Sequence, residues 1–96
     1  MIKIVKDNNI ITICGHANSG EYGKDIVCAS CSSIVYTTLN ALKKIKESSV
    51  EVEDNEKMII KVIENDEITN ALIENMMDLL KQLSEDYPKN VNVKES

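Results

Sequence analysis

The chain has 96 residues, of which 43% are apolar, so it can form one domain with a core of its own. Its net charge is −5, and all eleven basic residues are lysine. This composition argues against a general nucleic-acid binder, because bidentate recognition of guanine or phosphate usually depends on arginine. An acidic surface suits a basic protein partner, but a net charge also has the simpler role of keeping a protein soluble.

The cysteine count and the apolar runs bear on location. The three cysteines are an odd number, and no basic-then-apolar segment typical of a secretory signal precedes them, so we expect a protein of the reducing cytoplasm. The longest apolar run, residues 10–14, is far too short to span a bilayer. We therefore expect no membrane partner.

Hydrophobic periodicity and turn residues predict the elements of the fold. In chain order they are strands over residues 2–5 and 10–15, a helix over 25–46, strands over 50–53 and 58–64, a helix capped by Asn65 or Asp66 and ended by Pro88, and a short strand over 91–93. Polar turns join the strands of each pair into a hairpin. The order ββαββαβ predicts an α+β fold, a single domain over residues 1–96 with a mostly antiparallel sheet covered by two helices.

Each predicted helix has an apolar stripe at helical spacing, which should face the sheet. In the first helix the stripe is Val27, Cys31, Ile34, Thr38, Leu42 and Ile45, and in the second it is Ile68, Leu72, Met76, Leu79 and Leu83. On the second strand, Ile10, Thr12 and Cys14 share one face with His16. Cys14 and Cys31 are most simply interpreted as small buried apolar side chains.

The chain's single histidine, His16, ends the second strand, and Cys28 lies twelve positions later, where the first helix begins. With Asp25 as the N-cap, Cys28 is the third residue of that helix and lies in its first turn. A cysteine is a nucleophile as the thiolate, and both a neighbouring imidazole and a helix N-terminus favour that form. His16 and Cys28 are therefore a candidate catalytic dyad.

The segment between these two residues contains Gly20 and Gly23, two of the chain's three glycines, and is predicted to be a mobile loop with the glycines as hinges. Tyr22 in this loop is either a solvent-exposed aromatic or a contact of a lid. Ser32 lies one helical turn beyond Cys28 on the same side. It either bonds back to the helix backbone or orients a group of the site.

Two alternatives use the same residues. Cys14, His16, Cys28 and Cys31 supply the four ligands of a structural zinc site of the Cys3His type. Cys28 and Cys31 also form a C-x-x-C pair, which exchanges disulfides in thioredoxin-like proteins. Here a long loop precedes the pair, and the single proline, Pro88, is distant in the sequence.

Three sequence elements together resemble the signature of the ribosomal-processing cysteine proteases, the Prp family: Gly15-His16-Ala17, Gly23-Lys24-Asp25-Ile26-Val27-Cys28-Ala29, and Ser32. The resemblance covers the whole chain, and the combination is far more specific than a lone C-x-x-C. It implies an endopeptidase that removes the N-terminal extension of a basic large-subunit ribosomal protein, number twenty-seven in the usual series, and so supports ribosome assembly.

In that family the residues matching His16 and Cys28 form the catalytic dyad, the loop between them covers the site, and the proteins tend to be homodimers. The resemblance also implies that Gly15, Asp25 and Ser32 support the site. We expect no metal or other cofactor and no direct binding of nucleic acid.

One residue departs from the family, because Cys31 stands where an aliphatic residue is usual. It places a second thiol one turn from the nucleophile and keeps the zinc site open as an alternative. The alternative function is a non-enzymatic ribosome-associated binding protein, with or without that zinc site.

Overall fold

The computed structural model describes residues 1–15 and 26–96. Its elements are the strands β1 (Ile2–Asp7) and β2 (Ile10–Cys14), the helix α1 (Ile26–Ile45), the 3-10 helix η1 (Glu47–Ser49), the strands β3 (Val50–Asp54) and β4 (Met58–Val62), the helix α2 (Glu67–Asp86) and the strand β5 (Val91–Glu95). Apart from η1, which the sequence analysis missed, each element lies within two residues of its predicted range.

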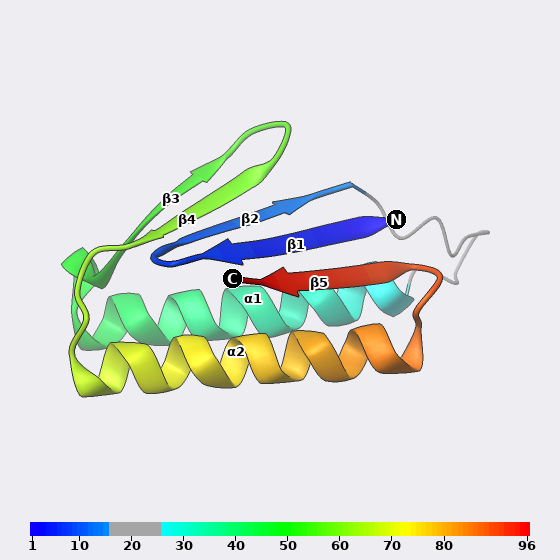
Figure 1. Ribbon diagram of the computed structural model, residues 1–96. Coiled ribbons are helices and arrows are strands. Elements are labelled where there is room, and N and C mark those ends of the chain that lie inside the picture. Colours follow the sequence, from blue (N-terminus) through cyan, green and yellow to red (C-terminus); the bar gives the residue numbers. More distant parts are fainter. Residues whose placement is uncertain (16–25) are drawn as a thin grey trace.

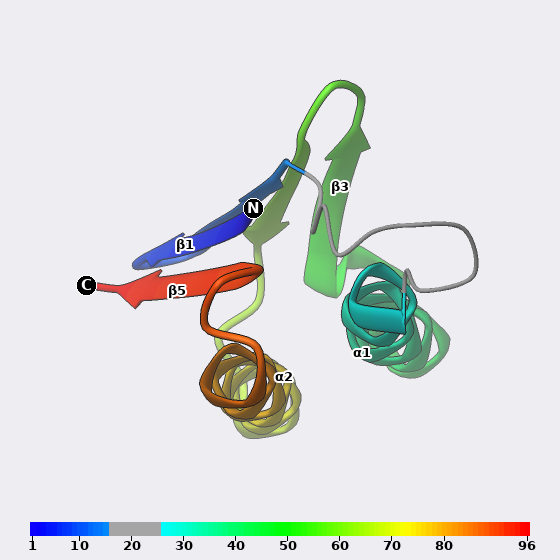
Figure 2. The ribbon, with the colours of Figure 1, turned by 90° about the vertical axis from the view of Figure 1, so that its right-hand side faces the viewer.

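The five described strands form one sheet in the order β3-β4-β2-β1-β5, and both helices lie on the same face of it (Figures 1 and 2). Neighbouring strands are antiparallel except β1 and β5, which run parallel. The predicted α+β class, the element order and the mostly antiparallel sheet are therefore confirmed.

Local sequence explains where α2 begins and ends. The Asp66 side chain accepts a hydrogen bond of 2.8 Å from the backbone N–H of Thr69, as expected of an N-cap. Because this bond favours the charged carboxylate, it lowers the pKa of Asp66. At the other end Tyr87 is the C-cap, and Pro88 cannot continue the helix.

The core lies between the sheet and the two helices. Ile4 and Ile11, from adjacent strands, have no exposed surface, and Met76 and Met77 of α2 are also buried. Burying one such side chain contributes about 1.5–3 kcal/mol to folding. A core built from aliphatic side chains and methionine therefore holds together a fold whose sequence has no tryptophan or phenylalanine.

The buried face of α2 agrees with the predicted stripe at Met76 and Leu83 and differs from it elsewhere. Ile68 and Leu79 are 55% and 46% exposed, and the buried residues of the helix are Thr69, Ile73, Met76, Met77, Leu80 and Leu83. The sequence of α2 has two adjacent apolar stripes, and periodicity cannot distinguish between them. In α1 the prediction fails at Ile45, which is 58% exposed at the end of the helix.

In the described part of the chain, one face of the sheet carries no helix (Figure 2), and alternate residues of each strand lie on that face. On β2, Ile11 faces the core, whereas Ile10, Thr12 and Cys14 lie on the opposite face, as the two-residue period predicts. Along this face Thr12 lies between Val5 and Ile59. No helix in the described part of the chain has the length and apolar character needed to cross a membrane.

Candidate active site

Cys28 is the third residue of α1, the position predicted from the sequence. The N–H groups of a first helical turn have no partner within the helix, and the helix dipole favours a negative charge there. The first turn of α1 contains no acidic residue to oppose that effect. Cys28 is partly buried and packs against the hydrophobic core. Cys28 therefore lies at the end of α1 where backbone N–H groups are directed.

Cys31 and Ser32 are the neighbours of Cys28 one turn further along α1. Cys31 is 5% exposed, and burial, followed by the proximity of Cys28, raises its pKa to about 11. Cys31 is therefore a protonated thiol at neutral pH and a poor nucleophile. Its interpretation as a small buried apolar side chain agrees with this burial.

A cavity of about 270 Å³ opens beside this side of α1. Ile13, Val35 and Met58 are apolar residues of its lining, and most of the other lining residues come from α1 and from the turn between β3 and β4. A lining that combines apolar and polar residues is typical of sites that bind peptides or small molecules. The residues that line it are Ile13, Cys14, Gly15, Cys31, Ser32, Val35, Tyr36, Asp54, Asn55, Glu56, Lys57 and Met58.

Cys14 differs from its predicted role, because it is only partly buried. It lies at the end of β2 on the face without helices, so the side chain has no second layer over it. There it lines both the cavity beside α1 and a wider hollow of about 640 Å³ next to Ile59 and Glu53. Cys14 therefore belongs to the surface around the site and not to the core.

Gly15 has a structural requirement of its own. Its φ of +90° lies in the region that favours glycine, and a Cβ built on it would overlap the backbone carbonyl oxygen of Met1. The glycine therefore lets β2 end tightly against the start of β1. It is the last described residue before His16.

The structure describes some of the predicted site residues and not others. Gly15 and Ser32 line the same cavity, and Cys28 lies one helical turn from Ser32. The predictions for His16, Gly20, Gly23 and Asp25 concern residues outside the described part of the chain. The same holds for Tyr22.

Two residues that the sequence analysis missed also line the cavity. The Tyr36 hydroxyl donates a hydrogen bond of 2.8 Å to Oδ2 of Asp54, the last residue of β3. This bond to a carboxylate raises the pKa of Tyr36. Helical spacing indicates Tyr36, which lies two turns beyond Cys28 on the same side. Nothing in the sequence indicates Asp54, because the contact depends on how the hairpin folds over.

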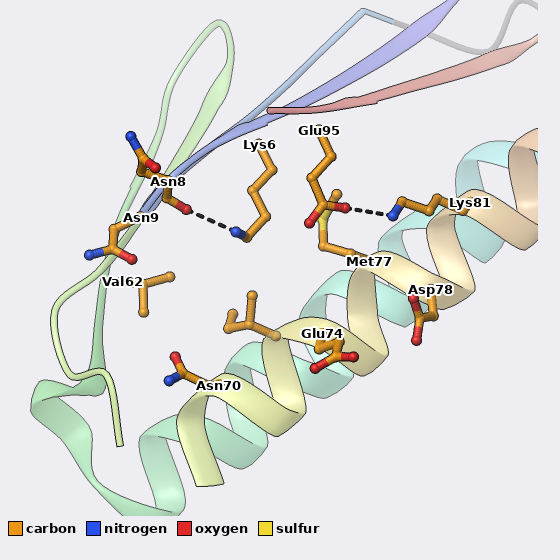
Figure 3. Close-up of a pocket in the computed structure, with 11 residues that line it drawn as sticks. Lys6, Asn8, Asn9, Val62, Asn70, Glu74, Met77, Asp78, Lys81 and Glu95 are labelled. Carbon is orange, nitrogen blue, oxygen red and sulfur yellow. Dashed lines mark hydrogen bonds and ion pairs between the residues drawn. The ribbon is translucent and has the colours of Figure 1, made fainter. Parts of the chain in front are cut away.

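A separate cavity of about 330 Å³ lies on α2, between that helix and the β1–β2 turn (Figure 3). Charged side chains at its edge already have partners. Lys81 forms an ion pair of 2.6 Å with Glu95, and Lys6 Nζ donates a bond of 2.9 Å to the Asn8 carbonyl. Among the described residues, the lining of this cavity contains no cysteine. It is therefore no candidate for catalysis by a thiol.

Metal binding has no support among the described residues. Across residues 1–15 and 26–96, no three histidine, cysteine, aspartate or glutamate side chains are grouped closely enough to hold an ion. The alternative zinc site includes His16, which lies outside these ranges, so the structure does not test that alternative directly.

The raised pKa of Cys31 has a measurable effect on stability. The folded protein prefers the thiol, so this preference stabilises it fully below the ordinary pKa of 9.0 and is lost as the pH rises towards about 11. Between pH 8 and 11, the free energy of unfolding of the unmodified protein should fall by about 2 kcal/mol more than that of Cys31→Val, because valine cannot ionise. Urea unfolding at each pH measures this. Parallel pH curves for the two proteins would contradict it.

Comparison with known proteins identifies the family of the chain. The family model for cysteine protease Prp matches residues 1–92. The ribosomal processing cysteine protease Prp of Staphylococcus aureus is 30% identical over 83 residues, which are 82% of this chain and 78% of that protein.

Solved structures agree with the fold. The crystal structure of S. aureus Prp with a covalently linked product peptide has a TM-score of 0.86 at 22% identity, covering 99% of this chain and 97% of that one. A Streptococcus mutans protein has a TM-score of 0.81 at 30% identity, covering 98% and 90%. With the family model matching nearly all of a sequence that places Cys28 in the first turn of its helix, the chain belongs to the Prp family of cysteine proteases.

Proposed function

We propose that this protein is a cysteine endopeptidase that removes the N-terminal extension of the large-subunit ribosomal protein numbered twenty-seven in the usual series, and so supports ribosome assembly. The observation that carries the proposal is the place of Cys28, in the first turn of a helix that continues along a partly apolar cavity. The S. aureus relative is named for ribosomal processing, and one of its crystal structures contains a substrate peptide.

In the proposed mechanism His16 takes the proton of Cys28, and the thiolate attacks the scissile carbonyl carbon. Backbone N–H groups of the first turn of α1 stabilise the oxyanion. Protonated His16 then gives its proton to the leaving amine, and water releases the acyl group from Cys28. Asp25 is our first candidate for a group that orients His16.

The remaining predicted residues have supporting roles in this proposal. Gly15 follows β2 and directly precedes His16 in the sequence. Ser32 lines the cavity one turn from Cys28. Gly20 and Gly23 are proposed as the hinges of a segment that closes over the bound peptide and excludes water.

The proposed partner is the basic precursor of the ribosomal protein. A net charge of −5 favours its approach over distances of about a Debye length. We further propose that the protein is a homodimer of the cytoplasm that binds neither nucleic acid nor membranes directly.

The direct test is to incubate the protein with a synthetic peptide that spans the N-terminal extension and the first residues of the mature ribosomal protein. Mass spectrometry should find two product peptides, and pretreatment with iodoacetamide should prevent cleavage in proportion to the alkylation of Cys28. A peptide that binds but stays intact would instead favour a binding protein without proteolytic activity.

A metal assay tests the zinc alternative. We expect purified protein to hold far less than one zinc per chain and to keep its melting temperature after treatment with a chelator. A fold that needs zinc loses its stability when the ion is removed. One tightly held zinc per chain, with unfolding on chelation, would contradict the protease assignment of Cys28.

A further inference from the structure

The turn between β3 and β4 lines the cavity and extends past the paired part of the sheet. The pairing of β2 with β4 ends at Ile13 and Met58, so residues 55–57 project beyond it. Figures 1 and 2 show this hairpin rising away from the rest of the sheet. Asp54 pairs with Met58 at the base of this turn, so only the three turn residues lie outside the strand pairing.

One side-chain hydrogen bond ties this hairpin to α1. The Tyr36 hydroxyl donates to Oδ2 of Asp54 at 2.8 Å, and both residues line the cavity. This pair therefore links α1 directly to the end of β3. Tyr36 is 43% exposed, so the hydroxyl has solvent as its alternative partner and is not required to satisfy a buried group.

The length of α1 from Cys28 to the far end of the cavity fits a short stretch of extended chain. Cys28 and Tyr36 are two turns apart on α1, and a helix rises about 1.5 Å per residue, which gives a distance of roughly 12 Å. An extended peptide covers about 3.3 Å per residue. This stretch of α1, which lines the cavity from Cys31 onward, thus spans about three to four substrate residues.

We propose that this cavity holds about three to four residues of the substrate on one side of the scissile bond, and that Tyr36 and Asp54 are a positioning pair that sets its width. The inference rests on the proposed function, because it takes Cys28 as the nucleophile. Tyr36 and Asp54 act through the link they form between α1 and β3, and neither takes part in the chemistry at sulfur.

The test uses the ribosomal-protein peptide with a fluorescent label, bound to protein that carries Cys28→Ala and so cannot cleave it. Adding Tyr36→Phe removes one hydroxyl and should raise the Kd by roughly threefold to tenfold, the effect of one hydrogen bond. Asp54→Ala should raise the Kd equally, and the two changes together should be no worse than either alone. Asp54→Asn keeps an acceptor and should raise the Kd less.

Two further measurements complete the design. In protein that retains Cys28, Tyr36→Phe should raise KM and leave kcat within about twofold, since the chemistry is untouched. Tyr87→Phe removes a hydroxyl at the end of α2 and should change neither constant. An unchanged Kd for Tyr36→Phe, or effects of the two variants that simply add, would overturn the inference. A loss of peptide binding that is explained by a lower melting temperature of the variant would also overturn the inference.

The same measurements separate this inference from the proposed function. A peptide that binds with the expected Tyr36 dependence but is never cleaved would refute proteolysis and leave the cavity assignment standing. Cleavage that needs Cys28 but ignores Tyr36 would refute the cavity assignment alone.

Discussion

Cys28→Ala is expected to lower kcat for peptide cleavage by roughly 10⁴-fold or more, the effect of removing a nucleophile from a catalytic unit. Alanine is a good helix former and is smaller than cysteine, so the fold should be retained. The measurement is the rate of product formation by mass spectrometry, with a melting curve of the same sample. A melting temperature within a few degrees of the unmodified protein shows that the loss is chemical.

His16→Ala should be nearly as damaging, because the thiol then loses the group that takes its proton. Cys14→Ser and Cys31→Ser are the matched controls, and each should retain most activity. Cys31 is buried and its raised pKa keeps it protonated, while Cys14 lies at the edge of the cavity. If Cys31→Ser stopped cleavage as completely as Cys28→Ala, the assignment of a single nucleophile would be wrong.

Outside the proposed dyad, Gly15→Ala should have the largest effect. A residue other than glycine held at a strained backbone conformation costs about 1–3 kcal/mol, and the overlap of the new Cβ with the Met1 carbonyl adds to this. The end of β2 must then shift away from β1, and the chain leading to His16 shifts with it. We expect a lower free energy of unfolding in urea and a fall in kcat beyond the folded fraction.

Asn8→Ala is the control for positive φ alone. Asn8 has a φ of +54° in the β1–β2 turn and already carries a Cβ, so alanine should cost about 1 kcal/mol or less and leave kcat unchanged. A Gly15→Ala protein as stable and active as the unmodified one would show that Met1 moves aside without cost. Gly15 would then have no special role beside the site.

Local patterns predicted much of this fold because the physics behind them is local. The Asp66 side chain caps α2 by a bond to Thr69, three residues later, and Pro88 follows the end of that helix. Asn8 and Asn9 form a two-residue turn. Each of these features depends on a few consecutive residues. The positions of β2 and α1, which bring Gly15 to the cavity beside Ser32, followed from the same kind of signal.

Features that depend on distant residues were not predictable in this way. The exposure of Ile68 and Leu79 is decided by how α2 rotates against the sheet and α1, and the sequence of α2 fits more than one rotation. The bond between Tyr36 and Asp54 requires the β3–β4 hairpin to lie beside α1. The strand order was also beyond reach, because β5 pairs with β1 across the whole length of the described chain.

The parallel pairing of β1 with β5 has a consequence for how the protein is made. Ile2 pairs with Val91, so the edge of β1 that faces β5 stays without a partner until nearly the whole described sequence has left the ribosome. Closing so long a loop is entropically costly, and contacts between distant segments slow folding. Before β5 arrives, β1 exposes an open strand edge of the kind that promotes aggregation. Synthesis must therefore reach β5 before this edge of β1 is covered, and the nascent chain carries the open edge until then.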